Sequence, residues 1–135
     1  MNSKVLTRNF FLVVLLSIFF AFDWAPFELP KSISDAVKTG NSAQLAKHFF
    51  DNIEVIISGK ENIYSRTQAE RILNEFFSKN QPKDFVILHQ GGKNASQFAI
   101  GRLSTNNGTY RFTMFMKTEG EKQLIHQLRI ENEIE

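Results

Sequence analysis

The stretch that decides the fold is residues 65–82, SRTQAERILNEFFSKNQP. Ser65 and Gln68 have the S-x-x-Q spacing of a capping box, in which two side chains satisfy backbone groups at the start of a helix. Asn80 and Pro82 are typical of a helix end. Between them, apolar residues recur at the intervals of one helix face, at Ala69, Ile72, Leu73, Phe76 and Phe77. The stretch therefore predicts an amphipathic helix with one broad apolar face.

Strand-like segments follow this helix. They are separated by residue pairs typical of tight turns between antiparallel strands, namely Gly91-Gly92, Asn107-Gly108 and Glu119-Gly120. The predicted strands are at about 84–90, 95–105, 109–118 and 123–131. We therefore expect a four-stranded antiparallel meander.

Upstream of the helix the elements are shorter. A first helix ends at Gly40, a usual residue at a helix C-terminus, and a second, capped by Asn41 or its neighbour, closes near Asp51. The β-branched run 53–57 predicts a strand, and residues 63–64 add a brief one.

The two faces of the sheet follow from its hairpin registers. A two-residue turn at 107–108 pairs Leu103 with Phe112, and a three-residue loop at 118–120 pairs Phe112 with His126. A two-residue loop in the last hairpin would mix polar and apolar side chains on both faces, so the longer loop is favoured. The face toward the helices then carries Tyr110, Phe112, Met114, Met116, Leu124, His126, Leu128 and Ile130.

The opposite face of the predicted sheet is not simply polar. Beside Arg102, Arg111, Lys117 and Arg129 it carries an apolar cluster of Phe98, Ile100, Phe115 and Ile125. A cluster of this kind on the outer side of a sheet marks a protein contact more often than bare surface. We therefore expect a homodimer through this face.

The first 25 residues have the layout of a signal peptide. Residues 10–22, FFLVVLLSIFFAF, are apolar at 12 of 13 positions and follow a short basic stretch. Such a run spans only about 20 Å as a helix, short of the ~30 Å hydrocarbon layer of a membrane. We expect a signal peptide at 1–25 and a single domain at 26–135. Because no clear A-x-A-like cleavage site is present, an uncleaved anchor is an alternative.

The net charge of +2 belongs to this N-terminal segment. Lys4 and Arg8 supply it, and from Asp23 onward basic and acidic residues balance at 14 each. A neutral domain lacks long-range attraction to nucleic acid, so nucleic acid is not an expected partner. The absence of cysteine excludes disulfides and thiolate chemistry.

Four stretches resemble a family of small exported bacterial proteins of unknown function within the nuclear-transport-factor-2-like (SnoaL-like, cystatin-like) superfamily. They are ISDAVK at 33–38, IYSRTQAE at 63–70, ILHQGG at 87–92 and LIHQLRIE at 124–131. The resemblance covers about residues 28–132. It implies an α+β cone in which a curved antiparallel sheet, the meander plus one or two N-terminal strands, packs on about three helices. It also implies dimerisation and a periplasmic or extracellular location in a Gram-negative-type bacterium, and it brings no catalytic motif.

His126 is the residue best suited to chemistry, because on the predicted register it points toward the helices. A neutral imidazole there would act as a general base or contact a ligand; the alternative is a core histidine bonded to backbone or to Tyr64. Histidines at unrelated spacings do not form a metal site, and no phosphate loop or hydrolase triad is present, so we expect no metal or cofactor. The expected pocket-lining residues are Tyr64, Tyr110, Phe112, Met114 and His126.

Three functions remain open. The favoured one is a non-enzymatic, exported homodimer that binds a small apolar ligand or a partner protein in its helix–sheet cleft. The second is an isomerase or dehydratase with His126 as base and Tyr64 as hydrogen-bond donor, which requires the two side chains to converge on a solvent-reachable cavity. The third is a subunit of a periplasmic assembly, tethered by an uncleaved N-terminus.

Overall fold

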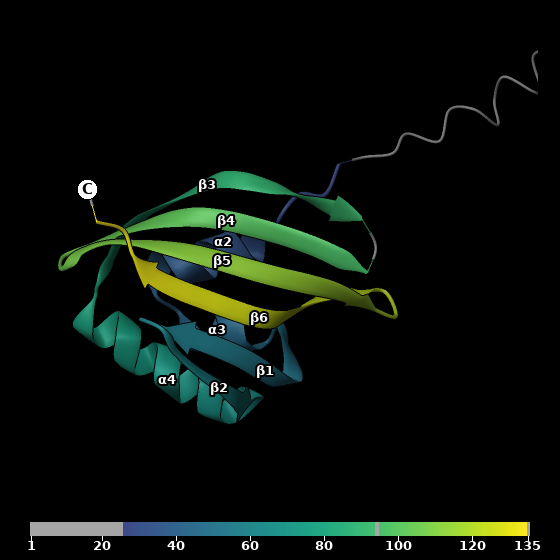
Figure 1. The fold of residues 1–135 in the computed structure, drawn as a ribbon, viewed down its shortest axis with the longest axis horizontal. Helices are drawn as coiled ribbons and strands as arrows, with labels where there is room; N and C mark the ends of the chain where they lie inside the picture. Colours follow the sequence, from purple (N-terminus) through teal and green to yellow (C-terminus); the bar gives the residue numbers. More distant parts are fainter. Residues whose placement is uncertain (1–25, 94, 135) are drawn as a thin grey trace, which may run out of the picture.

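The computed structural model describes residues 26–93 and 95–134, which form a curved sheet wrapped around helices (Figure 1). The sheet has the strand order β2-β1-β6-β5-β4-β3 and does not close into a barrel. Neighbouring strands are antiparallel except β1 and β6, which are parallel. The elements are α2 (Lys31–Thr39), α3 (Ser42–Ala46), β1 (Phe49–Ile57), β2 (Lys60–Ser65), α4 (Arg66–Lys79), β3 (Pro82–Lys93), β4 (Ser96–Thr105), β5 (Gly108–Glu119) and β6 (Lys122–Asn132). The predicted α+β class and curved sheet are confirmed.

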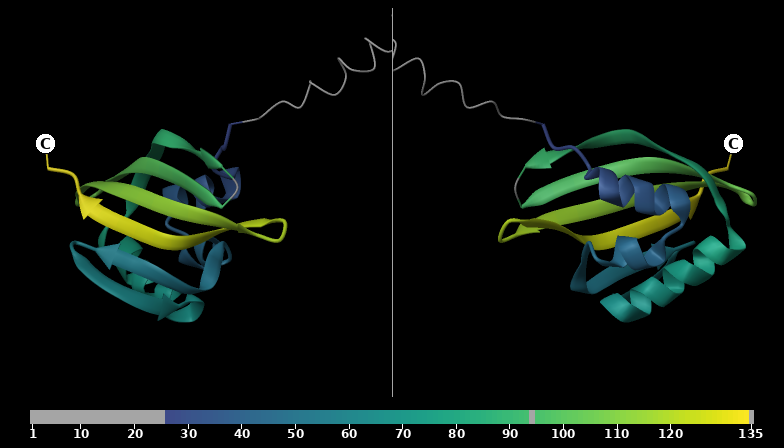
Figure 2. Two further views of the ribbon diagram at one scale, coloured as in Figure 1. Left: turned by 45° about the vertical axis from the view of Figure 1, so that its right-hand side comes forward. Right: turned by 180° about the vertical axis from the view of Figure 1, so that it is seen from behind.

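The described helices lie on one face of the sheet (Figure 2). α2 contacts β3, α4 contacts β1 and β2, and α3 contacts both α2 and α4. Within the described ranges no helix is long and apolar enough to cross a membrane. The predicted signal peptide at 1–25 lies outside those ranges.

Helix α4 begins with the predicted capping box. Ser65 Oγ accepts the Gln68 N–H at 3.2 Å, and Gln68 Oε1 accepts the Ser65 N–H at 3.1 Å. The next residue, Arg66, donates to the Phe49 carbonyl oxygen at 2.9 Å and to the Asp51 carboxylate at 3.0 Å. The start of α4 is therefore tied to the start of β1.

The second predicted helix is shorter than expected. It ends at Ala46, and the residues up to Asp51 enter β1, so the prediction of a helix to Asp51 is wrong. Phe49 is fully buried and pairs with Ile125 of β6. The four-residue spacing of Leu45 and Phe49 fits a helix, but pairing with a distant strand decides the local structure.

The predicted turn at Gly91-Gly92 is also wrong, because both glycines lie within β3. The hairpin turn follows Lys93 instead. Gly92 has a φ of 99°, and a Cβ there would lie far closer to the Ser96 carbonyl than the 3.0 Å that real Cβ atoms keep. Glycine is required here by a close approach of backbone, not by a two-residue turn.

The turn between β4 and β5 lies at 106–107, one residue earlier than predicted. Leu103 consequently pairs with Tyr110 and not with Phe112. Thr105 holds this turn, since its Oγ1 accepts a backbone N–H of the turn at 3.1 Å. The pairing slips by two residues, so every side chain keeps its predicted face.

The last hairpin departs from the prediction in two ways that compensate. Its turn has two residues, 120–121, rather than three. A β-bulge then inserts His126 as an extra residue in β6 opposite β5. Because of the bulge, Ile125 and Leu128 are three residues apart and both lie fully buried in the core.

The bulge overturns three predicted orientations. Ile125, predicted on the outer apolar face, is fully buried. Leu124 and His126, predicted to face the helices, lie on the outer side of the sheet. The mixing of polar and apolar side chains expected from a two-residue loop does not occur, because the bulge at His126 reverses the alternation for the rest of β6.

The centre of the core is aromatic. Phe112 of β5 packs against Phe76 and Phe77 of α4 and against Phe85 of β3, with ring centroids 6.0–6.3 Å apart. All four side chains are buried. This cluster holds α4 against the sheet and so positions the cleft beside it.

Candidate functional site: a cleft beside helix α4

A cleft of about 550 Å³ opens between α4 and the strands β1, β2 and β5. Its size falls within the ~300–1,000 Å³ typical of small-molecule sites. The lining residues are Val55, Ile57, Ser58, Lys60, Asn62, Tyr64, Ile72, Glu75, Phe76, Lys79, Asn80 and Tyr110. The cleft therefore combines aliphatic and aromatic walls with a limited set of polar groups.

Strand β2 presents every second side chain to the cleft. Lys60, Asn62 and Tyr64 line it, whereas Ile63 between them is 74% exposed. Successive side chains of a strand point to opposite faces. The short strand thereby places one ammonium group, one amide and one phenol along a single wall.

The two tyrosines of the cleft differ in their hydrogen bonds. The Tyr110 hydroxyl donates to Asn80 Oδ1 at 2.8 Å, and Asn80 Nδ2 donates to the Phe76 carbonyl at 3.0 Å. The Tyr64 hydroxyl makes no hydrogen bond within residues 26–93 and 95–134. One phenol is thus committed to the fold, and the other is available to a ligand.

Three charged side chains line the cleft. Lys60 comes from β2, and Lys79 and Glu75 come from the last turns of α4. Neither lysine lies within 4.0 Å of a carboxylate in the described part of the chain. The lining therefore carries one net positive charge and two ammonium groups without ion pairs among the described residues.

His126 lies outside this cleft, on the outer face of the sheet. Its ring centroid is 6.4 Å from that of Phe50 and 6.4 Å from that of Phe115. Burial, and next the charge of Lys117, lower the pKa of His126 below its ordinary 6.5, which favours the neutral imidazole. Tyr64 lies on the inner face. The predicted convergence of His126 and Tyr64 on one cavity is therefore wrong, and the catalytic hypothesis built on it fails.

The other predicted pocket residues divide into two pairs. Tyr64 and Tyr110 line the cleft. Phe112 and Met114 lie on the same side of the sheet, but both are fully buried in the core and line none of the described hollows. The prediction identified the correct face of β5, and packing against α4 decides which of its residues reach solvent.

Sequence reasoning missed the polar part of the cleft. It expected a strand only at 63–64, whereas β2 begins at Lys60. Side chains alternate between the two faces of a strand, so extending the strand back from Tyr64 would have placed Asn62 and Lys60 on the same face as Tyr64. Lys79 follows Ile72 and Phe76 at i+7 and i+3, so helical spacing would have placed it on their side of α4.

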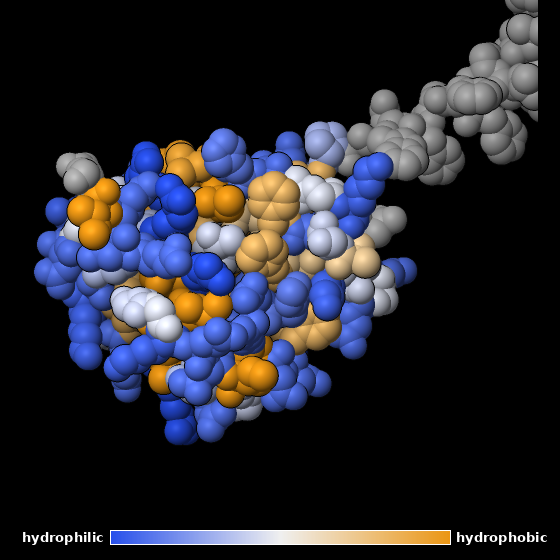
Figure 3. All heavy atoms as spheres, viewed as in Figure 1, coloured by the Kyte–Doolittle hydropathy of each residue, from blue (hydrophilic) through white to orange (hydrophobic). Residues whose placement is uncertain are grey.

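The outer face of the sheet carries an apolar patch, seen in Figure 3 as orange side chains over β3, β4 and β5. We call Val86, Phe98, Ile100 and Phe115 the outer patch. Phe98 pairs directly with Phe115, and Val86 is 51% exposed. Ile125, predicted to belong here, does not, and His126 borders the patch instead.

The charged residues beside the outer patch pair with one another. Arg102 binds the Glu133 carboxylate at 2.8 Å and Arg111 binds it at 3.2 Å. Hydrogen bonds from these two guanidinium groups lower the pKa of Glu133. Arg129 lies 3.7 Å from Glu131. The three arginines of the rim therefore share two carboxylates, and the rim keeps a net positive charge to which Lys117 adds.

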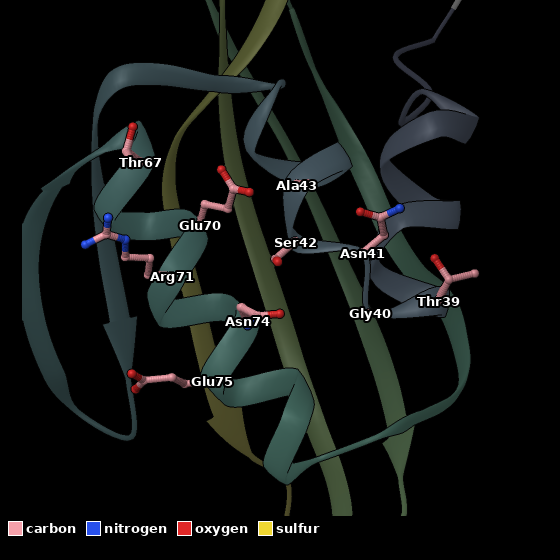
Figure 4. A pocket seen from close by; sticks show the side chains of 10 residues that line it. All are labelled: Thr39, Gly40, Asn41, Ser42, Ala43, Thr67, Glu70, Arg71, Asn74 and Glu75. Carbon is pink, nitrogen blue, oxygen red and sulfur yellow. The ribbon is translucent and has the colours of Figure 1, made fainter.

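A second hollow, of about 830 Å³, lies between α4 and the segment that joins α2 to α3 (Figure 4). Glu70 and Asn74 point from α4 toward that segment, while Arg71 and Glu75 point away from it. Polar and small residues line it, without an aromatic side chain. Among the described residues, no group of three or more His, Asp or Glu side chains could hold a metal ion.

Comparison with solved structures places the chain on a known fold. A DUF4783 family protein from Bacteroides uniformis ATCC 8492 is 35% identical, with a TM-score of 0.76 over 80% of this chain and 100% of that chain. The protein called "Rd1NTF2_04 with long sheet" is 21% identical, with a TM-score of 0.60 over 74% and 94% of the two chains. A domain of unknown function with a cystatin-like fold from Nostoc punctiforme PCC 73102 is 12% identical, with a TM-score of 0.62 over 78% and 73%.

The last two likenesses show the fold alone, and they confirm the expected nuclear-transport-factor-2-like and cystatin-like fold. No curated protein matches the chain. The family described as "Domain of unknown function (DUF4783)" matches residues 30–131, almost the whole described domain. The chain therefore belongs to the DUF4783 family.

Proposed function

We propose that this domain is a binding module that holds a small molecule with an apolar body in the cleft beside α4. The cleft itself carries the proposal. Its walls include Val55, Ile57, Ile72 and Phe76, and its volume of about 550 Å³ suits a small ligand. Burial of apolar ligand surface against these walls would supply the main driving force.

The composition of the cleft favours binding over catalysis. No histidine is among its lining residues, and His126 lies on the other face of the sheet. The acid–base pair expected for an isomerase or dehydratase is thus not assembled there. A domain that retains a ligand without transforming it fits this arrangement.

Fluorescence of N-phenylnaphthylamine, a neutral dye that brightens in apolar sites, tests the proposal. In the variant Asn62→Trp a large ring replaces a polar side chain inside the cleft. The control is Ile63→Trp, the same ring on the exposed side of the same strand. We expect saturable dye binding that N62W abolishes and I63W preserves. Absence of saturable binding, or equal binding by both variants, contradicts the proposal.

We further propose that the domain acts as a homodimer through the outer patch. An isologous dimer brings the same surface from two chains together. The outer patch suits this because its centre is apolar, while Arg102, Arg111 and Arg129 at its rim bind carboxylates of the same chain. A second copy would cover the apolar side chains and leave the charged rim at the edge of the contact.

Native mass spectrometry and sedimentation of the full domain test the dimer. Phe115→Glu places a carboxylate at the centre of the outer patch and should give monomers. Ile63→Glu, at an exposed apolar residue of β2, should leave the dimer intact. A monomeric wild type, or a dimer that survives F115E, contradicts this part of the proposal.

We also propose that the chain is exported, as the sequence predicts. The basic and apolar segment before residue 26 would direct the chain out of the cytoplasm. N-terminal sequencing of protein from a periplasmic fraction provides the test. A new N-terminus near residue 26 supports cleavage, an intact Met1 in the membrane fraction supports the tethered alternative, and a cytoplasmic protein contradicts both.

A further inference from the structure

We infer that the ligand of the cleft carries a single negative charge, such as a carboxylate or sulfonate on an apolar body, held by Lys60 and Lys79. This inference rests on the proposed binding function and names the class of molecule bound. It follows from the charges and the hydrogen-bonding groups that the cleft presents.

The charge of the cleft is the first argument. Lys60 and Lys79 reach it from two separate elements, and neither has a carboxylate within 4.0 Å among the described residues. Glu75 precedes Lys79 by one helical turn, a spacing that favours an ion pair, yet the two are not paired. An anionic group on the ligand would give both ammonium groups the partner that the described chain does not provide.

The excess of donors over acceptors is the second argument. Lys60 and Lys79 can only donate, and the Tyr64 hydroxyl is unused by the described residues. Asn62 adds two N–H donors and one carbonyl acceptor, and the one carboxylate in the lining is Glu75. A carboxylate or sulfonate only accepts hydrogen bonds, so it complements this set better than an alcohol or an amine does.

The walls limit the charge of the ligand to one. Two lysines against one glutamate leave a single net positive charge, and the remaining wall is formed by Val55, Ile57, Ile72 and Phe76. A polyphosphate would bring several negative charges against apolar side chains, at a large desolvation cost. A monoanion with an apolar body satisfies both halves of the cleft.

A matched pair of dyes tests the inference. Anilinonaphthalene sulfonate and N-phenylnaphthylamine share one apolar body, and only the first carries a sulfonate. Both are titrated into the full domain, into Lys60→Gln, Lys79→Gln and the double variant, and into the control Lys122→Gln. Lys122 is an exposed lysine in the hairpin between β5 and β6, whereas the cleft contacts the other end of β5 at Tyr110.

We expect the anionic dye to bind more tightly than the neutral one. Each cleft substitution should weaken the binding of the anionic dye about two- to fivefold, the range of a partly exposed ion pair. K122Q should bind the anionic dye as tightly as the unsubstituted domain does, and the affinity for the neutral dye should be the same in every variant. Circular dichroism checks that each variant is folded. Saturable binding of the neutral dye with no preference for the anion, or an anion preference that survives the double variant, overturns the inference but not the binding function. Loss of binding for both dyes overturns the binding function itself.

Discussion

Gly101 in the middle of β4 leaves room for the ring of Phe85, and this close approach predicts a measurable coupling between the two residues. In Gly101→Ala the new Cβ would overlap that ring, inside the 3.0 Å that real Cβ atoms keep. Phe85 cannot simply swing away, because it is 7% exposed and its ring centroid lies 6.0 Å from that of Phe112. The substitution must therefore disturb the aromatic core.

The expected cost follows from two opposing effects. Overpacking of this kind destabilises a protein by about 1–3 kcal/mol. Loss of glycine's freedom in the unfolded chain offsets about 0.4–1 kcal/mol of this. We expect G101A to lower the free energy of unfolding by about 1–2 kcal/mol. Gly91→Ala in the neighbouring strand is the control: its Cβ would meet Phe98 at an ordinary 3.4 Å, so only the effect on the unfolded chain remains, and stability should stay the same or rise by up to about 1 kcal/mol.

Urea denaturation followed by circular dichroism measures both effects, and a double-mutant cycle isolates the contact. In the background Phe85→Leu, which lacks the ring, G101A should cost less than about 0.5 kcal/mol, which corresponds to a coupling of about 0.5–2 kcal/mol. The reasoning is refuted if G101A costs the same in both backgrounds. It is equally refuted if G91A proves as destabilising as G101A.

Three further predictions concern single residues. Ser65→Ala removes the cap of α4 and should lower the free energy of unfolding by about 1 kcal/mol in urea denaturation; an unchanged midpoint would contradict the role of the capping box. Ser58 has a φ of 50° in the two-residue turn that it forms with Gly59, and Asn-Gly is the preferred pair in such a turn. Ser58→Asn should therefore raise the thermal midpoint, with a gain in the free energy of unfolding of about 0.5 kcal/mol. A loss of stability would refute the turn assignment. Because burial lowers the pKa of His126 below 6.5, the unfolded chain binds that proton more readily. The free energy of unfolding should therefore hold its full value above pH 6.5 and fall as the pH decreases below it. His126→Gln should make this pH dependence shallower and leave the part due to His48, whose pKa burial also lowers. An unchanged pH dependence would contradict the reasoning.

Local sequence signals were sufficient for the elements of this fold. The capping box and the apolar spacing of α4 involve residues three or four apart, so the helix is encoded within its own segment. The strands of the meander follow in the same way from alternation and turn residues. Predictions failed at Phe49 and at Gly92, where contacts with distant strands outweigh local preference.

The orientation of β6 shows why pairing could not be predicted. A pattern of alternation assigns faces only while the strand stays regular, and the bulge at His126 breaks that regularity in one residue. The prediction therefore placed His126 in the cavity and Ile125 on the surface, the reverse of the structure. Leu128 and Ile130 lie on their predicted face because the bulge at His126 restores the predicted alternation in the rest of β6.

The residues of the candidate cleft likewise fall into those that the sequence predicted and those that it did not. Tyr64 and Tyr110 were identified from the faces of their strands, and both line the cleft. Lys79 was not, although it lies at helical spacing from Ile72 and Phe76, because only the packing of α4 beside β1 and β2 makes that side of the helix a wall of the cleft. The sequence by itself indicated the family through the resemblance of four short stretches. It also determined the α+β class and most of the elements, because these depend on short-range periodicity and caps. The tertiary structure alone decided which side chains surround the cleft and which face His126 occupies, because one bulge and one helix packing angle move side chains between faces without changing the local pattern.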